Sequence, residues 1–341
     1  MAQSAPRRAF VTGATGMIGS HLVRRLLDEG WGVRALVRPT SDTKLLTSWG
    51  VDLVPGAIGD PADAFASHLE GAEVVFHCAA LVSDWAPLDE MVRVNVDGTR
   101  ALAEAVLAAP SVKRMVYLSS MAVFGMAPQI EMDETAPVIR TGDNYNLTKI
   151  RAEEILGDLA RDRGLSAVML RPPYVYGPRD RQFIPRLLEG LRSGQFTFLG
   201  SGLQPITLCY VRNLVDALLA AGEKPVAGGE VFLITDGEAL TRVRLLEVVC
   251  QITGYPMPTK RVPVWLPKLL CPFSEGLALV RRTSEPPLIN RFRIKFLSTP
   301  MTFRLDKARR ILGYDPAVDT ETGLRETLAW FREHRPDLLP G

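Results

Sequence analysis

The sequence of 341 residues contains little cysteine or histidine and no surplus of one sign of charge. Its four cysteines are scattered and form no CxxC pair, which favours buried thiols in a reducing, cytoplasmic environment. Its four histidines show no ligand-pair spacing with a cysteine, so the sequence predicts no metal site. The net charge is +2, with acidic and basic residues interspersed, so the chain lacks the basic face of a nucleic-acid-binding protein.

Long apolar runs are also missing. The first residues, MAQSAPRRAFVTG, lack the apolar core of a signal peptide. No stretch approaches the roughly 18 uninterrupted apolar residues of a membrane span. The nearest one, Val262 to Val280, contains Lys268, Glu275 and several prolines. We interpret this segment as a cover on the substrate side and expect no membrane contact; contact with a membrane surface is the alternative.

Hydrophobic residues make up 47% of the chain, which is enough for a large core. Short apolar or β-branched runs alternate with helical patterns such as MIGSHLVRRLLDEG. Such runs are typical of strands buried on both faces of a parallel sheet, and repeated βα units predict an α/β, doubly wound fold. The predicted strands are RAFVTG, GVRALVR, VDLVPG, EVVFHCAA, VKRMVYLSS and SAVMLRP.

The stretch VTGATGMIGS follows the first strand and opens a helix. Its TGxxGxxG glycines permit a tight turn and a close approach of the backbone to a pyrophosphate, and the helix N-terminus offers N–H groups to the anion. A glycine-rich turn without a ligand is the alternative, but a βαβ series is the supporting context. We therefore predict a Rossmann-type domain over residues 1–178 and a smaller substrate-binding lobe over 179–341, some of whose segments return to the first domain. The residues expected at the cofactor are Gly13, Thr15, Gly16, Met17, Ile18 and Gly19.

The second predicted strand ends in Arg38. An acidic residue there would bind the 2′-hydroxyl of an NAD ribose, whereas an arginine can grip a 2′-phosphate. Lys44 can add charge, so the sequence favours NADP over NAD; a solvated arginine is the alternative. Asp60 is placed either to accept from the adenine amino group or to cap the next helix.

Six motifs occur in one order along the chain: TGxxGxxG, HCAA, NVDGT, YLSSMAVFG, YxxxK and RPPYVYGP. Together they resemble the extended short-chain dehydrogenases/reductases over nearly the whole length. The resemblance implies that a tyrosine acts as general acid/base and that a lysine activates it. It also implies a homodimer formed through a four-helix interface by the helices containing NVDGTRALAEAV and YNLTKIRAEEIL.

The YxxxK pair is Tyr145 and Lys149, which the i, i+4 spacing puts on one helix face. A free tyrosine has a pKa near ~10 and is a poor base at neutral pH, but a nearby ammonium stabilises its phenolate. The lysine can also hold the nicotinamide ribose. The resemblance assigns a serine after the fifth strand to polarise the substrate oxygen, and by register we choose Ser120, with Ser119 in support. It also gives Asn95 a role in supporting the active-site geometry, with a plain helix asparagine as the alternative.

The fourth predicted strand ends in His77, which we interpret as a satisfied buried histidine rather than a catalyst. The small residues that follow would let a cofactor lie close to the strand ends. Further residues expected at the cofactor are Ala79, Ala80, Leu81 and Pro172.

Three places distinguish members of the family that this chain resembles. Sugar-nucleotide dehydratases have a stretch similar to TDE at the end of the catalytic strand, because eliminating water needs an acid and a base. Here Met121 and Ala122 follow the serines, and neither side chain can transfer a proton. Sugar-nucleotide enzymes tend to carry FNVYGP, whereas here Tyr174 replaces the asparagine. The stretch LCYVRNLVDALLAA is similar to that of 3β-hydroxysteroid dehydrogenases and their bacterial relatives. Apolar or aromatic candidates for a substrate pocket, with core packing as the alternative for some, are Trp85, Met121, Phe124, Tyr174 and Phe183, joined by Ser83.

The sequence therefore predicts a nicotinamide-dependent alcohol dehydrogenase or ketoreductase for a small hydrophobic substrate. That substrate is a 3-hydroxy or 3-keto steroid, or a β-keto or aromatic ketone. One alternative is a sugar-nucleotide epimerase that works by transient oxidation with tightly bound NAD, although Arg38 and Tyr174 argue against it. The other is a non-enzymatic redox-sensing protein, although the serine, the tyrosine and the lysine are all present.

Overall fold

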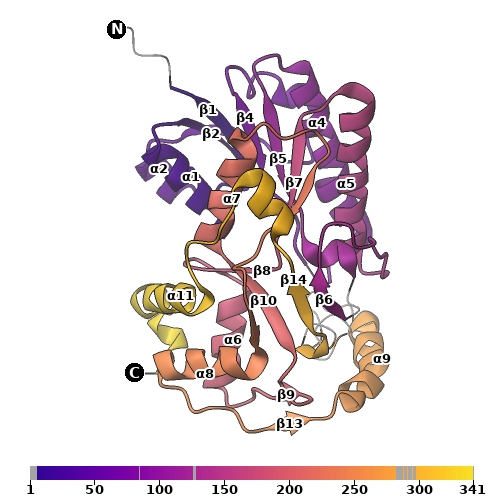
Figure 1. Cartoon of the computed structure of the whole chain (residues 1–341), viewed down its shortest axis with the longest axis vertical. Coiled ribbons are helices and arrows are strands. Elements are labelled where there is room, and N and C mark those ends of the chain that lie inside the picture. Colours follow the sequence, from indigo (N-terminus) through magenta and orange to yellow (C-terminus); the bar gives the residue numbers. More distant parts are fainter. Residues whose placement is uncertain are drawn as a thin grey trace.

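The computed structural model describes residues 6–83, 85–125, 128–281, 287, 290, 294 and 297–340. A seven-stranded parallel sheet runs through its larger part (Figure 1). All six strands expected from the apolar runs are present, and a seventh joins them at one edge. The strands are β1 (Arg8–Thr12), β2 (Gly32–Val37), β3 (Asp52–Pro55), β4 (Val74–His77), β5 (Arg114–Leu118), β7 (Ala167–Arg171) and β11 (Val231–Leu233).

The strand order is β11-β7-β5-β4-β1-β2-β3, so the winding direction reverses between β1 and β4. Ala9 pairs with Val33 on one side and with Val74 on the other. The connections that follow β1 and β4 lead to opposite halves of the sheet and leave a crevice outside the carboxyl ends of these two strands. Doubly wound sheets bind ligands in such a crevice. The expected α/β fold is confirmed, and its crevice lies at the end of the glycine-rich turn.

Helices cover both faces of this sheet because its strands are apolar on both sides. Val11 packs with α1 and α7 on one face, while Phe10 packs with α4 and α5 on the other. The helical elements of this part are α1 (Met17–Asp28), α2 (Lys44–Ser48), η1 (Ala62–Phe65), α3 (Leu88–Val92), η2 (Arg93–Asp97), α4 (Gly98–Ala108), η3 (Met121–Phe124), α5 (Asn144–Arg163), α7 (Val211–Glu223) and η4 (Ala308–Leu312).

Helix α5 is the longest helix described, and its ends have clear causes. Asp143 caps its N-terminus by accepting from the backbone N–H of Tyr145 at 2.8 Å. Gly164 ends it in the left-handed conformation at φ 71°, with Arg161 and Arg163 in the last turn. The cap places Tyr145 in the first turn, next to the carboxyl ends of the strands.

A second lobe lies beyond those strand ends and contains three small sheets (Figure 1). One has the order β12-β10-β8, and the others pair β13 with β9 and β14 with β6. Their strands are β6 (Gln129–Met132), β8 (Tyr174–Tyr176), β9 (Phe198–Leu199), β10 (Pro205–Tyr210), β12 (Ala239–Thr241), β13 (Arg261–Val262) and β14 (Met301–Phe303). The helices are α6 (Phe183–Arg192), α8 (Arg242–Thr253), α9 (Trp265–Val280), α11 (Thr320–His334) and η5 (Pro336–Leu338).

The chain crosses the predicted boundary at residue 178 in both directions. Strands β6 and β8 lie before it in sequence and join sheets of the lobe. Helix α7 and strand β11 lie after it and complete the seven-stranded sheet. The division into residues 1–178 and 179–341 is therefore approximate, because long-range strand pairing and not chain order assigns these segments.

The segment interpreted as a cover, Val262 to Val280, forms the end of β13 and helix α9 at the margin of the lobe (Figure 1). Among the residues that the structure describes, no helix is both long and apolar enough to cross a membrane.

Candidate functional site

The glycine-rich turn lies against the end of β4. Gly13 has φ +73°, and a Cβ there would come within 2.7 Å of the Ala79 backbone nitrogen. A Cβ on Gly19 would approach the Gly13 carbonyl oxygen to 2.2 Å. The Thr12 hydroxyl accepts from the Ala79 N–H at 3.2 Å and ties the two strand ends together. Only glycine allows the backbone to fold this tightly, and glycines in such a turn let a ligand pyrophosphate approach the backbone closely.

Helix α1 begins directly after this turn. Its N-cap, Gly16, has no side chain with which to satisfy the first N–H groups of the helix. These N–H groups and the positive end of the helix dipole fit a pyrophosphate. Thr15 and Gly16 lie in the turn, while Met17 and Ile18 pack against the core of the lobe. The residues present therefore fit a dinucleotide across the β1–β4 crevice.

The residues expected at the adenosine end are at the surface. Arg38, just after β2, and Lys44, at the start of α2, are both exposed. Between them the Asp42 carboxylate accepts from the Lys44 backbone N–H at 3.2 Å. The sequence interpretation did not weigh this carboxylate. Asp60 accepts from the Ala57 N–H at 2.7 Å, so it closes its own turn and does not cap η1, whose N-cap is Pro61.

Tyr145, Ser120 and Lys149 come together at the carboxyl end of β5. Ser120 follows β5, and its hydroxyl caps η3 by accepting from the Ala122 N–H at 3.1 Å. Burial raises the pKa of Tyr145 to about 12, and a hydrogen bond with the Ser120 side chain opposes this rise. The Tyr145 hydroxyl is therefore protonated at neutral pH and lies beside the serine that sequence register had selected.

The Lys149 ammonium lies behind Tyr145, with its Nζ 5.9 Å from the Tyr145 ring centroid. It donates to the Leu118 carbonyl at 2.7 Å and to the Tyr117 hydroxyl at 3.1 Å. Burial lowers the pKa of Lys149 to about 8, while the charge of Glu153 opposes the fall. Lys149 thus remains largely cationic at neutral pH although it is only 2% exposed.

A buried ion pair supports this lysine from one turn further along α5. Arg171 binds Glu153 through two hydrogen bonds, at 2.9 Å and 2.6 Å, and both side chains are buried. The Ser119 hydroxyl also donates to Glu153, at 2.5 Å. Sequence reasoning missed Tyr117, Glu153 and Arg171. The signal available for Glu153 was its position four residues after Lys149, on the same helix face.

Asn95 links the loop after β4 to α5. Its amide oxygen accepts from the Leu81 N–H at 2.7 Å, and its nitrogen donates to the Leu81 carbonyl at 3.0 Å and to the Thr148 hydroxyl at 3.2 Å. It lies in the π-helical turn η2, a distortion frequent at functional sites. This geometry matches a supporting role, because Asn95 holds the loop that runs from Ala79 through Ala80 to Leu81.

His77 is satisfied by two hydroxyls, those of Thr12 at 2.8 Å and Thr99 at 3.0 Å. Burial, with a smaller contribution from the Lys149 charge, lowers the pKa of His77 to about 3. The ring is therefore neutral at physiological pH and has no free nitrogen for proton transfer, as expected for a structural histidine.

The wall opposite Tyr145 is aromatic and apolar. Tyr174, the first residue of β8, is half-buried, and its ring centroid lies 6.1 Å from that of Phe183 at the start of α6. Burial raises the pKa of Tyr174; the charge of Arg242 opposes this rise, and Asp143 and Tyr145 add to it. Met121 is mostly buried, and its N–H donates to the Pro172 carbonyl at 3.0 Å.

Two of the expected pocket residues have other roles. Phe124 is fully buried in the core, where Arg171 lies 4.9 Å over its ring and the Phe303 ring lies 6.2 Å away. The pocket assignment of Phe124 is therefore corrected to core packing. The Ser83 hydroxyl accepts from the N–H groups of Trp85 and Ala86 and so shapes its own loop. Trp85 is half-buried beside it; Asp84 lies outside the described residues.

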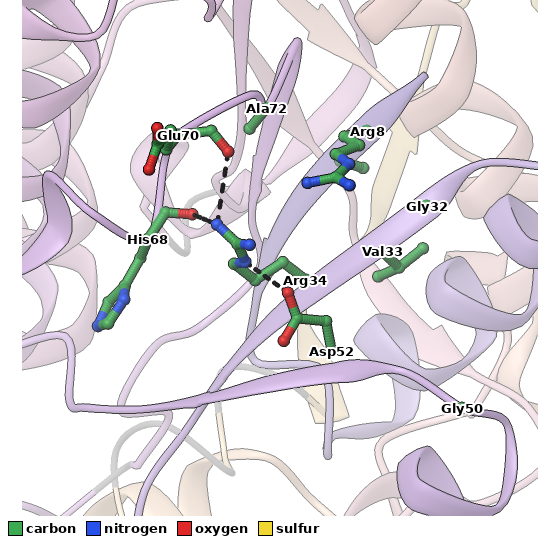
Figure 2. Close-up of a pocket in the computed structure, with 10 residues that line it drawn as sticks. Arg8, Gly32, Val33, Arg34, Gly50, Asp52, His68, Glu70 and Ala72 are labelled. Carbon is green, nitrogen blue, oxygen red and sulfur yellow. Dashed lines mark hydrogen bonds and ion pairs between the residues drawn. The ribbon is translucent and has the colours of Figure 1, made fainter. Parts of the chain in front are cut away.

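A separate hollow of about 290 Å³ opens at the amino ends of β1, β2 and β3 (Figure 2). An ion pair between Arg34 and Asp52 at 2.7 Å crosses it, and Arg34 also donates to the His68 carbonyl at 3.0 Å. Figure 2 shows these groups pointing toward one another across the hollow. Because doubly wound sheets bind ligands at the opposite end, this hollow does not belong to the site.

Comparisons with known proteins agree with this geometry. The chain is 32% identical to a 4-hydroxy-2-methyl-3-oxo-4-farnesyl-3,4-dihydroquinoline-1-oxide ketoreductase of Stigmatella aurantiaca, over 93% of this chain and 94% of that protein. It is 31% identical to a 3-beta-hydroxysteroid dehydrogenase of Mycolicibacterium neoaurum, over 96% and 92%. A solved UDP-glucose 4-epimerase of Thermotoga maritima, with UDP-glucose, superposes with a TM-score of 0.78 at 25% identity, covering 96% and 99%.

The family model for the NAD dependent epimerase/dehydratase family matches residues 9–235. The chain belongs to this family and is an oxidoreductase of the extended short-chain dehydrogenase/reductase type. The family assignment made from the six motifs is thereby confirmed.

Proposed function

We propose that the protein is an NADP(H)-dependent ketoreductase, or alcohol dehydrogenase, for a small hydrophobic substrate of the 3-ketosteroid, β-keto or aromatic ketone class. The observation that carries the proposal is the convergence of Tyr145, Ser120 and Lys149 opposite the aromatic wall formed by Tyr174 and Phe183. Charged groups lie behind the tyrosine and aromatic rings lie in front of it. This arrangement suits a ketone carried on a bulky apolar body.

Each of these residues has a separate role in the proposed reduction. Ser120 donates a hydrogen bond to the substrate oxygen, and Tyr145 transfers its proton to that oxygen during reduction. The positive charge of Lys149 stabilises the phenolate that Tyr145 leaves behind. Asn95 keeps the loop after β4 fixed to α5. The bound nicotinamide supplies or accepts the hydride. Because the pKa of Tyr145 is raised to about 12, its hydroxyl is protonated at neutral pH and can donate the proton that reduction requires.

The β1–α1 turn and the loop after β4 would hold the dinucleotide, with its pyrophosphate at the start of α1. Exposed Arg38 and Lys44 would hold a 2′-phosphate, which supports NADP over NAD. The kind of substrate is supported by the two relatives, which are named for a farnesyl-bearing ring ketone and for a steroid. The free thiols of Cys78, Cys209 and Cys250 support a cytoplasmic location. We retain the homodimer through α4 and α5 as part of the proposal.

The test is oxidation of NADPH and of NADH by the purified protein with 3-ketosteroids, long-chain β-keto acids and aromatic ketones. We expect turnover with NADPH that falls by about 10²- to 10⁴-fold in Tyr145→Phe, because the variant lacks the transferred proton. Tyr255→Phe is the matched control, since the hydroxyl of Tyr255 bonds the Leu338 carbonyl in the lobe. Tightly bound NAD with no net turnover of either cofactor would overturn the proposal in favour of an epimerase.

A further inference from the structure

Helix α9 turns a row of large apolar side chains toward solvent. The residues Trp265, Leu269, Phe273 and Leu277 are four apart, and Val280 follows after three more, so all five lie along one side of the helix. Their exposed fractions are 63%, 60%, 75%, 50% and 82%. We call these five residues the α9 stripe. Monomeric proteins rarely expose a contiguous apolar surface of this kind without a partner for it.

The opposite side of α9 already packs against the protein. Pro267, Cys271 and Ala278 are buried, and they recur at helical spacing on the face away from the α9 stripe. The helix is therefore apolar on two sides, of which only one contributes to the core. Rotation of the helix would expose the buried face instead, so packing among the residues that the structure describes does not explain the α9 stripe.

Other exposed apolar residues among the described part of the chain are distributed differently. Leu270 lies on α9 beside the stripe, and Val138 and Ile139 form a pair in a loop. The remaining ones lie far apart in the sequence: Val82, Leu88, Ile130, Leu203 and Ile311. Scattered residues of this kind are normal on protein surfaces. The α9 stripe differs because five large side chains share one helix face at the margin of the lobe (Figure 1).

The charges that flank the α9 stripe in the sequence are mostly positive. Exposed cations precede it at Lys260 and Arg261, accompany it at Lys268 and follow it at Arg281. Between residues 260 and 281 the sequence contains these four cations and one carboxylate, that of Glu275. An apolar face with a tryptophan at one end and cations around it is complementary to the headgroup region of an anionic bilayer.

Charge also argues against a second copy of this chain as the occupant. A two-fold contact between two α9 stripes would bring the same cationic flanks together, at a cost from like-charge repulsion. Helix length argues against a span. Sixteen residues extend over roughly 24 Å, short of the roughly 30 Å of a hydrocarbon core, whereas a helix lying in the interface needs only one apolar face.

We propose that α9 is a docking helix for anionic membrane surfaces and inserts the α9 stripe at the boundary between headgroups and acyl chains. From the sequence we expect the Val262–Val280 segment to be a cover without membrane contact. The exposed face of α9, which the sequence does not reveal, favours the alternative, contact with a membrane surface. The proposal goes beyond the ketoreductase function and does not depend on it, since docking involves neither the cofactor nor Tyr145.

The first experiment measures co-sedimentation of the full chain with vesicles of phosphatidylglycerol and phosphatidylcholine in equal parts, and with vesicles of phosphatidylcholine alone. We expect binding to the anionic vesicles that weakens with salt and falls at least tenfold in Phe273→Glu/Leu277→Glu. Val138→Glu/Ile311→Glu adds the same charge at exposed apolar positions elsewhere, and it should bind as the unchanged protein does. Circular dichroism and melting temperature show whether each variant is folded.

A second measurement keeps the test valid if the double variant fails to fold. Trp265 is one of five tryptophans, and its emission should shift to the blue on addition of anionic vesicles. The shift should disappear in Trp265→Phe, which leaves the other four in place. Absence of vesicle binding by the unchanged protein would overturn the proposal. So would equal binding by the stripe variant, or a self-association seen by sedimentation velocity that the stripe variant alone loses. Vesicle binding without turnover of any ketone would overturn only the proposed function.

Discussion

The two walls of the site differ in the side chains that form them. Beneath Tyr145 the wall contains buried charges, Lys149 with the ion pair of Glu153 and Arg171, each held by several hydrogen bonds. Opposite it, Tyr174 and Phe183 provide aromatic rings from the lobe, and the Arg242 guanidinium is the charge near Tyr174. A buried charge that loses its partner is costly, whereas apolar surfaces repack at small cost. The charged wall therefore tolerates little change, and the aromatic wall can vary to suit different substrates.

The largest expected effect comes from breaking the charged wall. Glu153→Gln should lower the free energy of unfolding by about 3–5 kcal/mol, because it leaves Arg171 buried without a countercharge. Loss of the Glu153 charge also removes an influence that raises the pKa of Lys149, so the alkaline limit of activity should move to lower pH. Urea unfolding and a pH–rate profile measure the two effects.

Its matched control is the next residue along the helix. Glu154 pairs with Arg140 at 2.5 Å, and both side chains are at least half exposed. Exposed pairs contribute about 0–1 kcal/mol, so Glu154→Gln should unfold almost as the unchanged protein does. Equal losses in the two variants would contradict the contrast between buried and exposed charge.

The second effect concerns the junction of the two parts of the molecule. Buried Asp236 accepts from the hydroxyl of Tyr176, the N–H of Tyr210 and the amide of Asn213. Burial raises the pKa of Asp236 from 3.8 to about 6, so the folded protein binds this proton more tightly than the unfolded chain. The free energy of unfolding should therefore fall as pH rises from 4 to 6, by up to about 3 kcal/mol from this group.

Asp236→Asn tests that sign. The difference in urea stability between the unchanged protein and the variant should depend on pH within the window from 4 to 6 and level off above it. A constant difference across the window would show that the carboxyl does not titrate there. Asp315→Asn, at an exposed position, controls for the general titration of surface carboxylates.

A third, smaller effect is expected at Arg38, an exposed residue on the cofactor side of the site. Arg38→Glu should raise the KM for NADPH roughly ten- to a hundredfold, because a charge-assisted hydrogen bond to a phosphate becomes a repulsion. The KM for NADH and the melting temperature should change little, since Arg38 is at the surface. Arg310→Glu, also exposed, serves as the control; an equal loss with NADH would refute a 2′-phosphate contact.

The smallest effect is expected at the aromatic wall. Tyr174→Leu should raise the KM for a bulky ketone by about tenfold while kcat and stability change less, because a leucine can fill part of the space. Phe124→Leu is informative beside it: Phe124 lies in the core, so its loss should lower stability and leave the KM nearly unchanged. The ratio of the two KM values separates a pocket residue from a core residue.

Sequence patterns predicted the catalytic residues better than the buried groups that support them. Tyr145, Lys149 and Ser120 lie in short motifs whose geometry follows from one helix and one strand end. The partners of Lys149 were missed because Glu153 and Arg171 meet only when α5 packs against β7. Phe124 was assigned to the pocket because an apolar residue beside a catalytic serine looks the same in sequence whether it faces the core or the substrate.

By itself the sequence determined the alternation of strands and helices, the glycine-rich turn and the spacing of the catalytic pair. These features are local, since they depend on backbone propensity and on periodicity within about one element. Only the tertiary structure decided that α7 and β11 return to the main sheet, that β6 pairs with β14, and that α9 presents its apolar stripe outward. Pairing and exposure depend on contacts between distant segments, and no single stretch of sequence contains that information.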